Sequence, residues 1–180
     1  MRTRIKDILF LFKEYRITND EWCLNNAEAL LDNAIEECTG EKASIEFVDL
    51  CRLGIAIEYL TKEGFIEGDV DVILADIDTY IMATVDNRPQ LDLNIKHGML
   101  ILALYLYERL YYRIQSESSH ILDLKECTIY LIDWIFDSML YDTVDKNYQE
   151  LYYVLMLLRK LDLFNSKIDR ISKLCKEEIA

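Results

Sequence analysis

Two histidines and five cysteines are the side chains of this sequence that could form a zinc site or a cysteine–histidine nucleophile. A catalytic zinc site needs about three protein ligands, usually brought to one face by short spacings. No cysteine lies three or four residues from His97 or His120, so such a site would require residues distant in sequence, for instance Cys51, Cys127 and His97, to converge through the fold. Either of those cysteines beside His97 could also form a thiolate nucleophile. We expect the thiols to act instead as small apolar side chains, and we assign no catalytic residue, metal ligand or cofactor.

Carboxylates offer a second kind of chemistry, acid–base catalysis or calcium binding. Asp76 and Asp78 lie two apart, so on a helix they point to different faces, and we expect them in solvent or between helices. Residues 67–71 (EGDVD) superficially resemble a calcium loop, but valines interrupt the oxygen ligands. We interpret Asp69 as a helix cap. Glu58 lies in an apolar helix, where it is either buried with a raised pKa or directed to solvent.

Tyrosines are concentrated in the second half of the chain, where they could line a groove for a peptide. Each ring offers apolar area and each hydroxyl offers a hydrogen bond. Core packing, with the hydroxyls at polar rims, is the alternative. The tyrosines concerned are Tyr105, Tyr107, Tyr111, Tyr112, Tyr130, Tyr141, Tyr148, Tyr152 and Tyr153.

The 180 residues carry a net charge of −13, from 20 basic and 33 acidic side chains. This charge repels phosphate backbones and anionic lipid surfaces, so we do not expect nucleic acid as a partner. It either keeps an apolar chain soluble or favours a basic peptide or protein partner. Five cysteines without a C-x-x-C pair fit reduced thiols, and with no visible secretory signal they predict a cytoplasmic location. The longest apolar run, residues 98–107, covers about half of the roughly 20 residues that a membrane span requires.

The elements that must position these side chains are predicted to be helices. A hydrophobic fraction of 52% excludes disorder, and 5 glycines with 1 proline are too few for many short strands. Thr18 with Glu21 predicts a capping box, Gly40 a helix stop, Ser44 a helix start and Pro89 a break. The length predicts one domain over residues 1–180. Apolar spacing predicts eight helices, at residues 1–16, 18–38, 45–60, 69–88, 93–114, 121–140, 148–161 and 166–179.

An internal repeat is visible as a very apolar helix, a short polar connector and a more amphipathic helix. The three copies begin at Asp49, Asn94 and Glu150. Each second helix contains an Ile-Asp pair followed closely by another isoleucine, with aspartates at Asp78, Asp133 and Asp169. Tyr59 and Tyr105 stand 46 residues apart at equivalent places, within the period of α-solenoids and α/α toroids. Chance repetition in an all-helical chain is the alternative.

Residues 52–78 (RLGIAIEYLTKEGFIEGDVDVILADID) and 97–106 (HGMLILALYL) resemble two successive repeats of the lanthionine synthetase C-like family. The resemblance covers residues 45–110 and implies antiparallel α/α hairpins in an open array, part of an α/α toroid. Gly54 and Gly98 match glycines that let backbones approach closely, whereas Arg52 stands where a glycine is expected. The family's zinc ligands, including a Cys-His pair, have no match here. The resemblance therefore implies a related fold without the family's chemistry.

We accordingly expect a non-catalytic helical-repeat protein that binds a peptide or protein, preferably a basic one, as an accessory to peptide maturation. Two alternatives stay open. One is a subunit of a zinc enzyme that another chain completes in an oligomer, and the other is a small interaction or immunity-type protein unrelated to peptide modification. The candidate partner-binding positions are Gly54, Glu58, Tyr59, His97, Gly98 and Tyr105.

Overall fold

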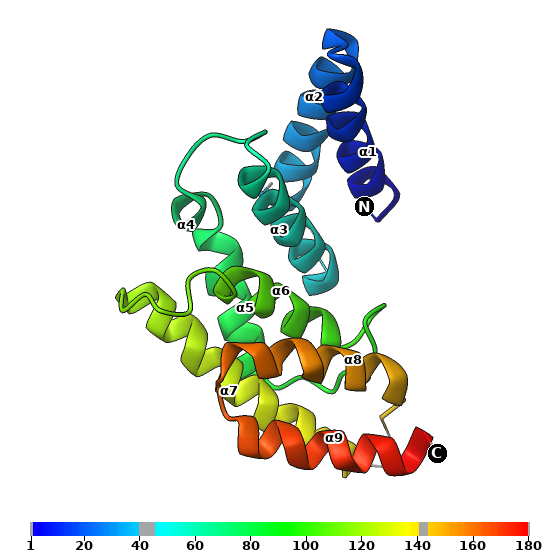
Figure 1. Cartoon of the computed structure of the whole chain (residues 1–180), viewed down its shortest axis with the longest axis vertical. Helices are drawn as coiled ribbons and strands as arrows, with labels where there is room; N and C mark the ends of the chain where they lie inside the picture. The colour runs from blue at the N-terminus through cyan, green and yellow to red at the C-terminus, as the bar shows by residue number, and fades with distance from the viewer. Residues whose placement is uncertain (1, 40–45, 141–143, 180) are drawn as a thin grey trace. The chain divides into compact units, whose positions relative to one another are not determined.

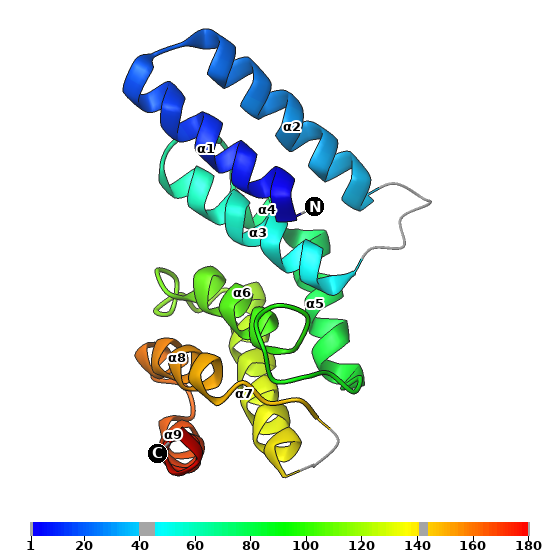
Figure 2. The ribbon, with the colours of Figure 1, turned by 90° about the vertical axis from the view of Figure 1, so that its right-hand side faces the viewer.

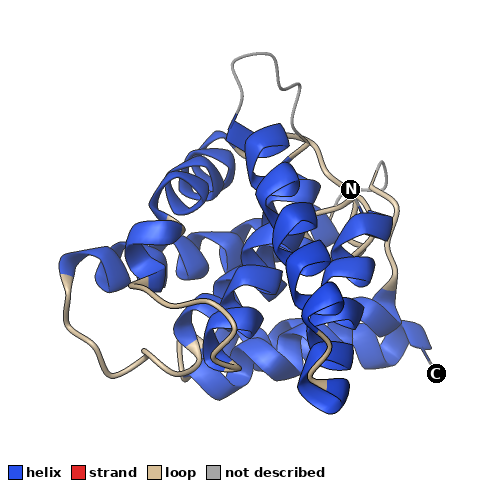
Figure 3. Cartoon of the chain, turned by 90° about the horizontal axis from the view of Figure 1, so that it is seen from above, coloured by secondary structure: helices blue, strands red, loops and turns tan. Residues whose placement is uncertain are grey.

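The computed structural model describes residues 2–39, 46–140 and 144–179. Within these ranges the chain is all-α, as predicted, with nine α-helices, one 3-10 turn and no strand (Figures 1 and 3). The predicted stop at Gly40, the start at Ser44 and the tyrosine Tyr141 lie outside the described residues. The elements are α1 (Arg2–Thr18), α2 (Glu21–Thr39), α3 (Phe47–Lys62), α4 (Val70–Ile73), α5 (Ala75–Asn87), α6 (Leu100–Leu110), α7 (Ser119–Met139), α8 (Tyr148–Leu158), η1 (Arg159–Leu161) and α9 (Asn165–Ile179).

The chain forms two compact units, residues 1–77 and residues 78–180, and the division falls within α5. Each unit buries apolar side chains of its own. The single domain expected over residues 1–180 would unfold cooperatively as a whole, and it stays a prediction. The toroid-like array also stays a prediction. Among the described helices, none combines the length and the apolar character needed to cross a bilayer.

Unit 1 is built around α1, α2 and α3, with α1 and α2 side by side and antiparallel (Figure 2). Their three-and-four spacing of apolar residues places one face of each helix in a shared core. Ile8 and Phe12 of α1 are buried there with Leu53 and Leu60 of α3. The ring of Phe12 lies 4.9 Å from that of Phe65, which follows α3 and packs against this core while partly buried.

Unit 2 is built around α6, whose residues are almost all buried and which packs against α7 and α8. The helices α8 and α9 form a hairpin, and α9 also contacts α7. Leu106 of α6, Leu131 of α7, Leu155 of α8 and Ile171 of α9 are fully buried. A helix that is apolar nearly all round needs such neighbours on several sides, which explains the central place of α6.

The capping box predicted at the start of the second helix is wrong. The helix α1 continues through Thr18, whose hydroxyl donates to the carbonyl of Glu14 at 2.8 Å. Asn19 then adopts a left-handed conformation with φ of 55°, which turns the chain. The cap of α2 is Asp20, whose carboxylate accepts the backbone N–H of Trp22 at 2.9 Å. Two good cap residues lie within three positions, and the one that α1 leaves unused serves as the cap.

The fourth predicted helix is present as two helices, α4 and α5, separated at Leu74. The carboxylate of Asp69 accepts the N–H of Asp71 at 2.9 Å, which confirms the predicted cap. Leu74 is fully buried, whereas no residue of α4 is. The predicted break near Pro89 is also confirmed, because α5 ends at Asn87.

The fifth predicted helix begins seven residues later than expected, at Leu100 instead of Leu93. Leu93 donates its N–H to the carbonyl of Asp145 at 2.8 Å and accepts the N–H of Asn147 at 2.9 Å. These bonds to a distant segment use the backbone groups that an α-helix would need. Gly98 closes the resulting turn, and a Cβ there would stand 1.9 Å from the carbonyl oxygen of Asp92.

Candidate functional site

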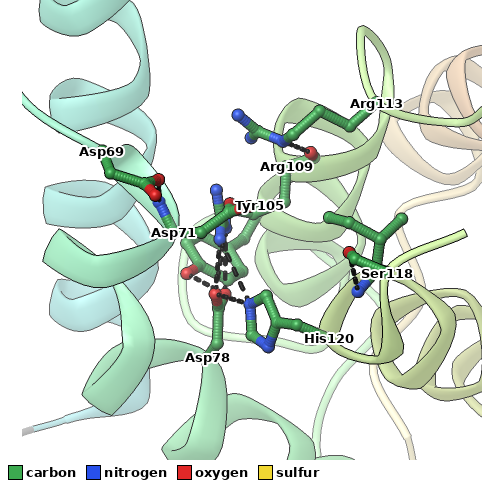
Figure 4. A network of polar contacts seen from close by, with 9 residues as sticks. Asp69, Asp71, Asp78, Tyr105, Arg109, Arg113, Ser118 and His120 are labelled. Carbon is green, nitrogen blue, oxygen red and sulfur yellow. Dashed lines mark hydrogen bonds and ion pairs between the residues drawn. The ribbon is translucent and has the colours of Figure 1, made fainter. Parts of the chain in front are cut away.

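Three helices of unit 2 meet at the carboxylate of Asp78 (Figure 4). Tyr105 of α6 donates its hydroxyl to Oδ1 at 2.5 Å. Arg109 of α6 donates through Nε to both oxygens at 3.1 Å and through an Nη to Oδ2 at 2.6 Å. His120, in the first turn of α7, places Nε2 at 2.8 Å from Oδ2. We call these four residues the Asp78 network.

The Asp78 network is buried except at one side chain. Asp78, Tyr105 and Arg109 are fully buried, whereas the side chain of His120 is 31% exposed. A charge taken out of water needs a partner and further hydrogen bonds, and here both carboxylate oxygens have them. Asp76 and Asp78 were each expected in solvent or between helices. Asp78 lies between helices, and Asp76 is exposed.

A carboxylate that contacts an imidazole orients it and stabilises its protonated form, which is one arrangement used in acid–base catalysis. In this network the guanidinium of Arg109 already balances the charge of Asp78. We assign the network the role of positioning α5, α6 and α7.

The other two aspartates of the repeated Ile-Asp pattern also form ion pairs. Asp133 of α7 pairs with Lys167 of α9. Asp169 of α9 pairs with Arg159 of η1 at 2.7 Å, and this guanidinium lowers the pKa of the Asp169 carboxyl. Each aspartate of the pattern thus meets a basic side chain from another element. The pattern marks contacts between elements, and the pair of Asp78 is the buried one.

A second feature of unit 2 is a group of tyrosine side chains at the end of α6 and on α8. We define the tyrosine cluster as Tyr107, Tyr111, Tyr112 and Tyr153. The ring of Tyr111 lies 5.1 Å from that of Tyr107 and 4.9 Å from that of Tyr112, the latter edge to face. Tyr153 on α8 is close enough to contribute to the raised pKa of Tyr107. These ring separations are in the favourable range for aromatic pairs.

The tyrosine cluster is anchored at one residue and exposed at the others. Tyr107 is buried, and burial is the main cause that raises the pKa of its hydroxyl to about 12, followed by the effects of Tyr111 and Glu108. Tyr111, Tyr112 and Tyr153 are 38%, 72% and 57% exposed. Core packing, the alternative for these tyrosines, thus holds for Tyr107 and not for the other three. Exposed aromatic faces offer apolar area and attract cations.

Three of the predicted partner-binding positions lie in α3 of unit 1. Gly54 and Glu58 are buried, so of the two alternatives for Glu58 the direction to solvent is excluded. Tyr59 is half-buried, and the Nζ of Lys13 lies 5.4 Å from the centre of its ring. None of the three belongs to the Asp78 network or to the tyrosine cluster.

The other three predicted positions lie in unit 2 and have different roles. His97 is exposed in the turn before α6, where its N–H donates to the side chain of Asn94 at 2.9 Å. Gly98 is buried against the backbone of Asp92 and permits that turn. Tyr105 belongs to the Asp78 network. The structure therefore gives Tyr105 a polar structural contact and gives Gly98 a backbone role.

The cysteines considered as nucleophiles are buried. Burial raises the pKa of the Cys51 thiol well above its usual value. Burial, with smaller effects of Asp86 and Asp78, raises the pKa of Cys127 to about 12. A thiol is a nucleophile as its thiolate, so these environments disfavour that role. The part of the chain that the structure describes contains no group of three or more histidine, cysteine, aspartate or glutamate side chains arranged for a metal ion.

The sequence analysis missed Arg109 and His120 as partners of Asp78. The available signal was Arg109 itself, a cation at the end of the most apolar segment of the chain. A charged residue in such a helix requires a buried counter-charge. His120 offered no comparable signal, because in the sequence it directly follows the polar run of residues 116–119 and no apolar pattern surrounds it.

No family model matches this sequence, and no match was found among curated proteins or solved structures. The resemblance to the lanthionine synthetase C-like family therefore stays a prediction.

Proposed function

We propose that this chain is a non-catalytic protein that binds a basic peptide segment through the tyrosine cluster. The observation that carries the proposal is the exposure of three neighbouring tyrosine rings, Tyr111, Tyr112 and Tyr153, beside the buried Tyr107. Clustered exposed aromatic side chains are typical of protein-binding surfaces, where tyrosine is enriched.

Charge complementarity supports a basic occupant. The chain has a net charge of −13, and Glu108 lies close enough to the cluster to affect the ionisation of Tyr107. A cation above a tyrosine face is stabilised by roughly 0.5–1 kcal/mol at an exposed site. An arginine or lysine side chain can therefore contact the rings while the acidic surface attracts the segment as a whole.

The chain already forms contacts of this kind within itself. The guanidinium of Arg16 lies 4.3 Å from the centre of the Phe65 ring. The Nζ of Lys176 lies 5.3 Å from the centre of the Tyr152 ring. We propose that a partner's cations contact the cluster in the same way. The resemblance of residues 45–110 to a peptide-modifying family supports a peptide as the partner and an accessory role in peptide maturation.

The test is calorimetric titration with a capped peptide of alternating glycine and arginine, at neutral pH and low ionic strength. We expect saturable binding to the wild-type chain, and no binding of the same peptide with glutamine in place of arginine. Tyr112→Ala lowers the affinity for the arginine peptide about two- to fivefold. The double variant Tyr112→Ala with Tyr153→Ala lowers it about tenfold. Unfolding curves establish that both variants fold.

The matched control is Tyr80→Ala, which removes a tyrosine that is 45% exposed and lies outside the cluster. This variant keeps wild-type affinity if the rings of the cluster form the site. An equal loss of affinity in Tyr80→Ala and Tyr112→Ala, or equal binding of the glutamine peptide, contradicts the proposal. Peptide binding that depends on charge alone would survive all three tyrosine substitutions.

A further inference from the structure

The hairpin of α8 and α9 contains a groove that the tyrosine cluster does not use. Its volume is about 330 Å³, in the size range of small-molecule sites. Tyr152 and Met156 of α8 provide apolar lining on one side. Basic side chains of η1 and α9 provide much of the rest. All of these residues belong to unit 2.

Ser172 of α9 lines this groove and is 6% exposed, yet its Oγ has no hydrogen-bond partner among the described residues. An unsatisfied buried hydroxyl costs roughly 1–3 kcal/mol. A serine inside a helix usually satisfies its hydroxyl on the carbonyl four residues earlier, so this arrangement is uncommon. The hydroxyl is available to donate a hydrogen bond to a ligand in the groove.

The groove is cationic in a chain that is strongly acidic. Arg159, Lys173 and Lys176 line it together with one carboxylate, Asp169. Arg159 pairs with Asp169, and Lys176 lies over the ring of Tyr152. Three cations and one carboxylate give the groove a net charge of +2, whereas the whole chain has a net charge of −13.

We infer that this groove binds a small organic phosphomonoester. A phosphomonoester carries a charge of about −1.5 to −2 at neutral pH and has three acceptor oxygens, which match the two excess positive charges and the hydroxyl of Ser172. A carboxylate would leave one of the two charges unbalanced. The apolar surface of Tyr152 and Met156 suits an organic group attached to the phosphate, so inorganic phosphate alone binds more weakly.

The same chemistry could come from a free metabolite or from a phosphorylated tyrosine of another protein. Both present a phosphate on an apolar body. The probes that distinguish them are phenyl phosphate and a short uncharged peptide that contains one phosphotyrosine. Tighter binding of the peptide assigns the groove to a protein-borne phosphate, and equal or weaker binding assigns it to a free one.

The experiment is a titration of the isotope-labelled full chain with phenyl phosphate, followed by backbone amide resonances at low ionic strength. We expect saturable shifts at Ser172, Lys173 and Lys176. Ser172→Ala weakens the affinity about tenfold, because it removes a hydrogen bond to a charged group. Lys173→Gln with Lys176→Gln weakens it by more than tenfold.

Two matched variants separate the site from general charge attraction. Lys160→Gln removes an exposed cation of η1 that does not line the groove, and Ser166→Ala removes an exposed hydroxyl of α9. Both keep wild-type affinity. Equal losses in Lys160→Gln and Lys173→Gln, shifts that never saturate, or equal binding of benzoate and phenyl phosphate overturn the inference.

A purely structural role of Ser172 gives a different result. If its hydroxyl only stabilised the hairpin, Ser172→Ala would lower the free energy of unfolding. We expect this variant to be as stable as the wild type or more stable, because alanine favours the helix and no hydrogen bond is lost. Unchanged stability with weaker binding of phenyl phosphate supports the ligand site, and lower stability with unchanged binding overturns it.

Discussion

At the scale of the residue, the ion pair of Asp78 and Arg109 differs in burial from the other ion pairs of the described residues. Both side chains are fully buried, and their atoms approach to 2.6 Å. Desolvating two ions costs about as much as their attraction returns, so the pair adds little net stability. Removing one partner is different, because the other charge is then left buried without compensation.

We predict that Arg109→Met lowers the free energy of unfolding by about 3–5 kcal/mol, the usual cost of an uncompensated buried charge. Asp78→Leu with Arg109→Met recovers most of that loss, because no charge is then left in the core. Urea unfolding followed by circular dichroism measures both. Arg159→Met is the control, since its pair with Asp169 is half-exposed, and it loses at most about 1 kcal/mol. A loss as small as this control in Arg109→Met would contradict the prediction.

The sequence indicates some of these residue roles and not others. Asp78 was expected in solvent or between helices, since two aspartates two apart cannot share one face of a helix, and it lies between helices. Which cation meets it depends on the approach of α6 and α7, which no local pattern encodes. The same holds for Ser172, whose sequence neighbours do not reveal that its hydroxyl lacks a partner.

At the scale of the element, helix existence follows from the sequence and helix boundaries follow from tertiary contacts. The apolar spacing is correct for α1, α2, α3, α7 and α9 to within a few residues. It fails at residues 93–99, where the pattern is helical but the backbone of Leu93 pairs with residues 145 and 147. Hydrogen bonds to a distant segment cannot be read from local periodicity.

We predict that Gly98→Ala lowers the free energy of unfolding by about 1–3 kcal/mol, the usual range for atoms forced into a packed site. The new Cβ would lie 1.9 Å from the carbonyl oxygen of Asp92 and 2.9 Å from that of Asn94, so the backbone must move. Urea unfolding measures the loss.

Gly64→Asn is the control for Gly98→Ala, because Gly64 has φ of 74° and nothing within 4 Å of its Cβ position. Asparagine tolerates that left-handed conformation, so we expect a loss below about 1 kcal/mol. If Gly98→Ala lowers the free energy of unfolding no more than Gly64→Asn does, the close approach of Gly98 to the backbone of Asp92 does not determine where α6 begins.

At the scale of the whole molecule, the net charge of −13 affects stability as well as binding. Repulsion among surface carboxylates opposes the compact state, and salt screens it. On α2 the exposed side chains of Glu28, Asp32 and Glu36 stand four residues apart, so like charges face each other. Each such pair costs about 0.2–0.5 kcal/mol at low salt.

We predict that sodium chloride at about 0.1–0.3 M raises the urea midpoint of unfolding and weakens the binding of the arginine peptide, since the Debye length falls to about 10 Å or less.

Asp32→Lys turns two repulsive contacts into attractive ones and stabilises the chain by about 1 kcal/mol at low salt, and the gain shrinks as salt is added. Asp32→Asn gives about half of that gain and controls for the loss of the carboxylate. If salt lowers the midpoint, or if Asp32→Lys gains as much at high salt as at low salt, repulsion among the acidic side chains does not limit stability. The positive charge of the groove of α8 and α9 would then act on a phosphate without measurable opposition from the acidic side chains elsewhere on the chain.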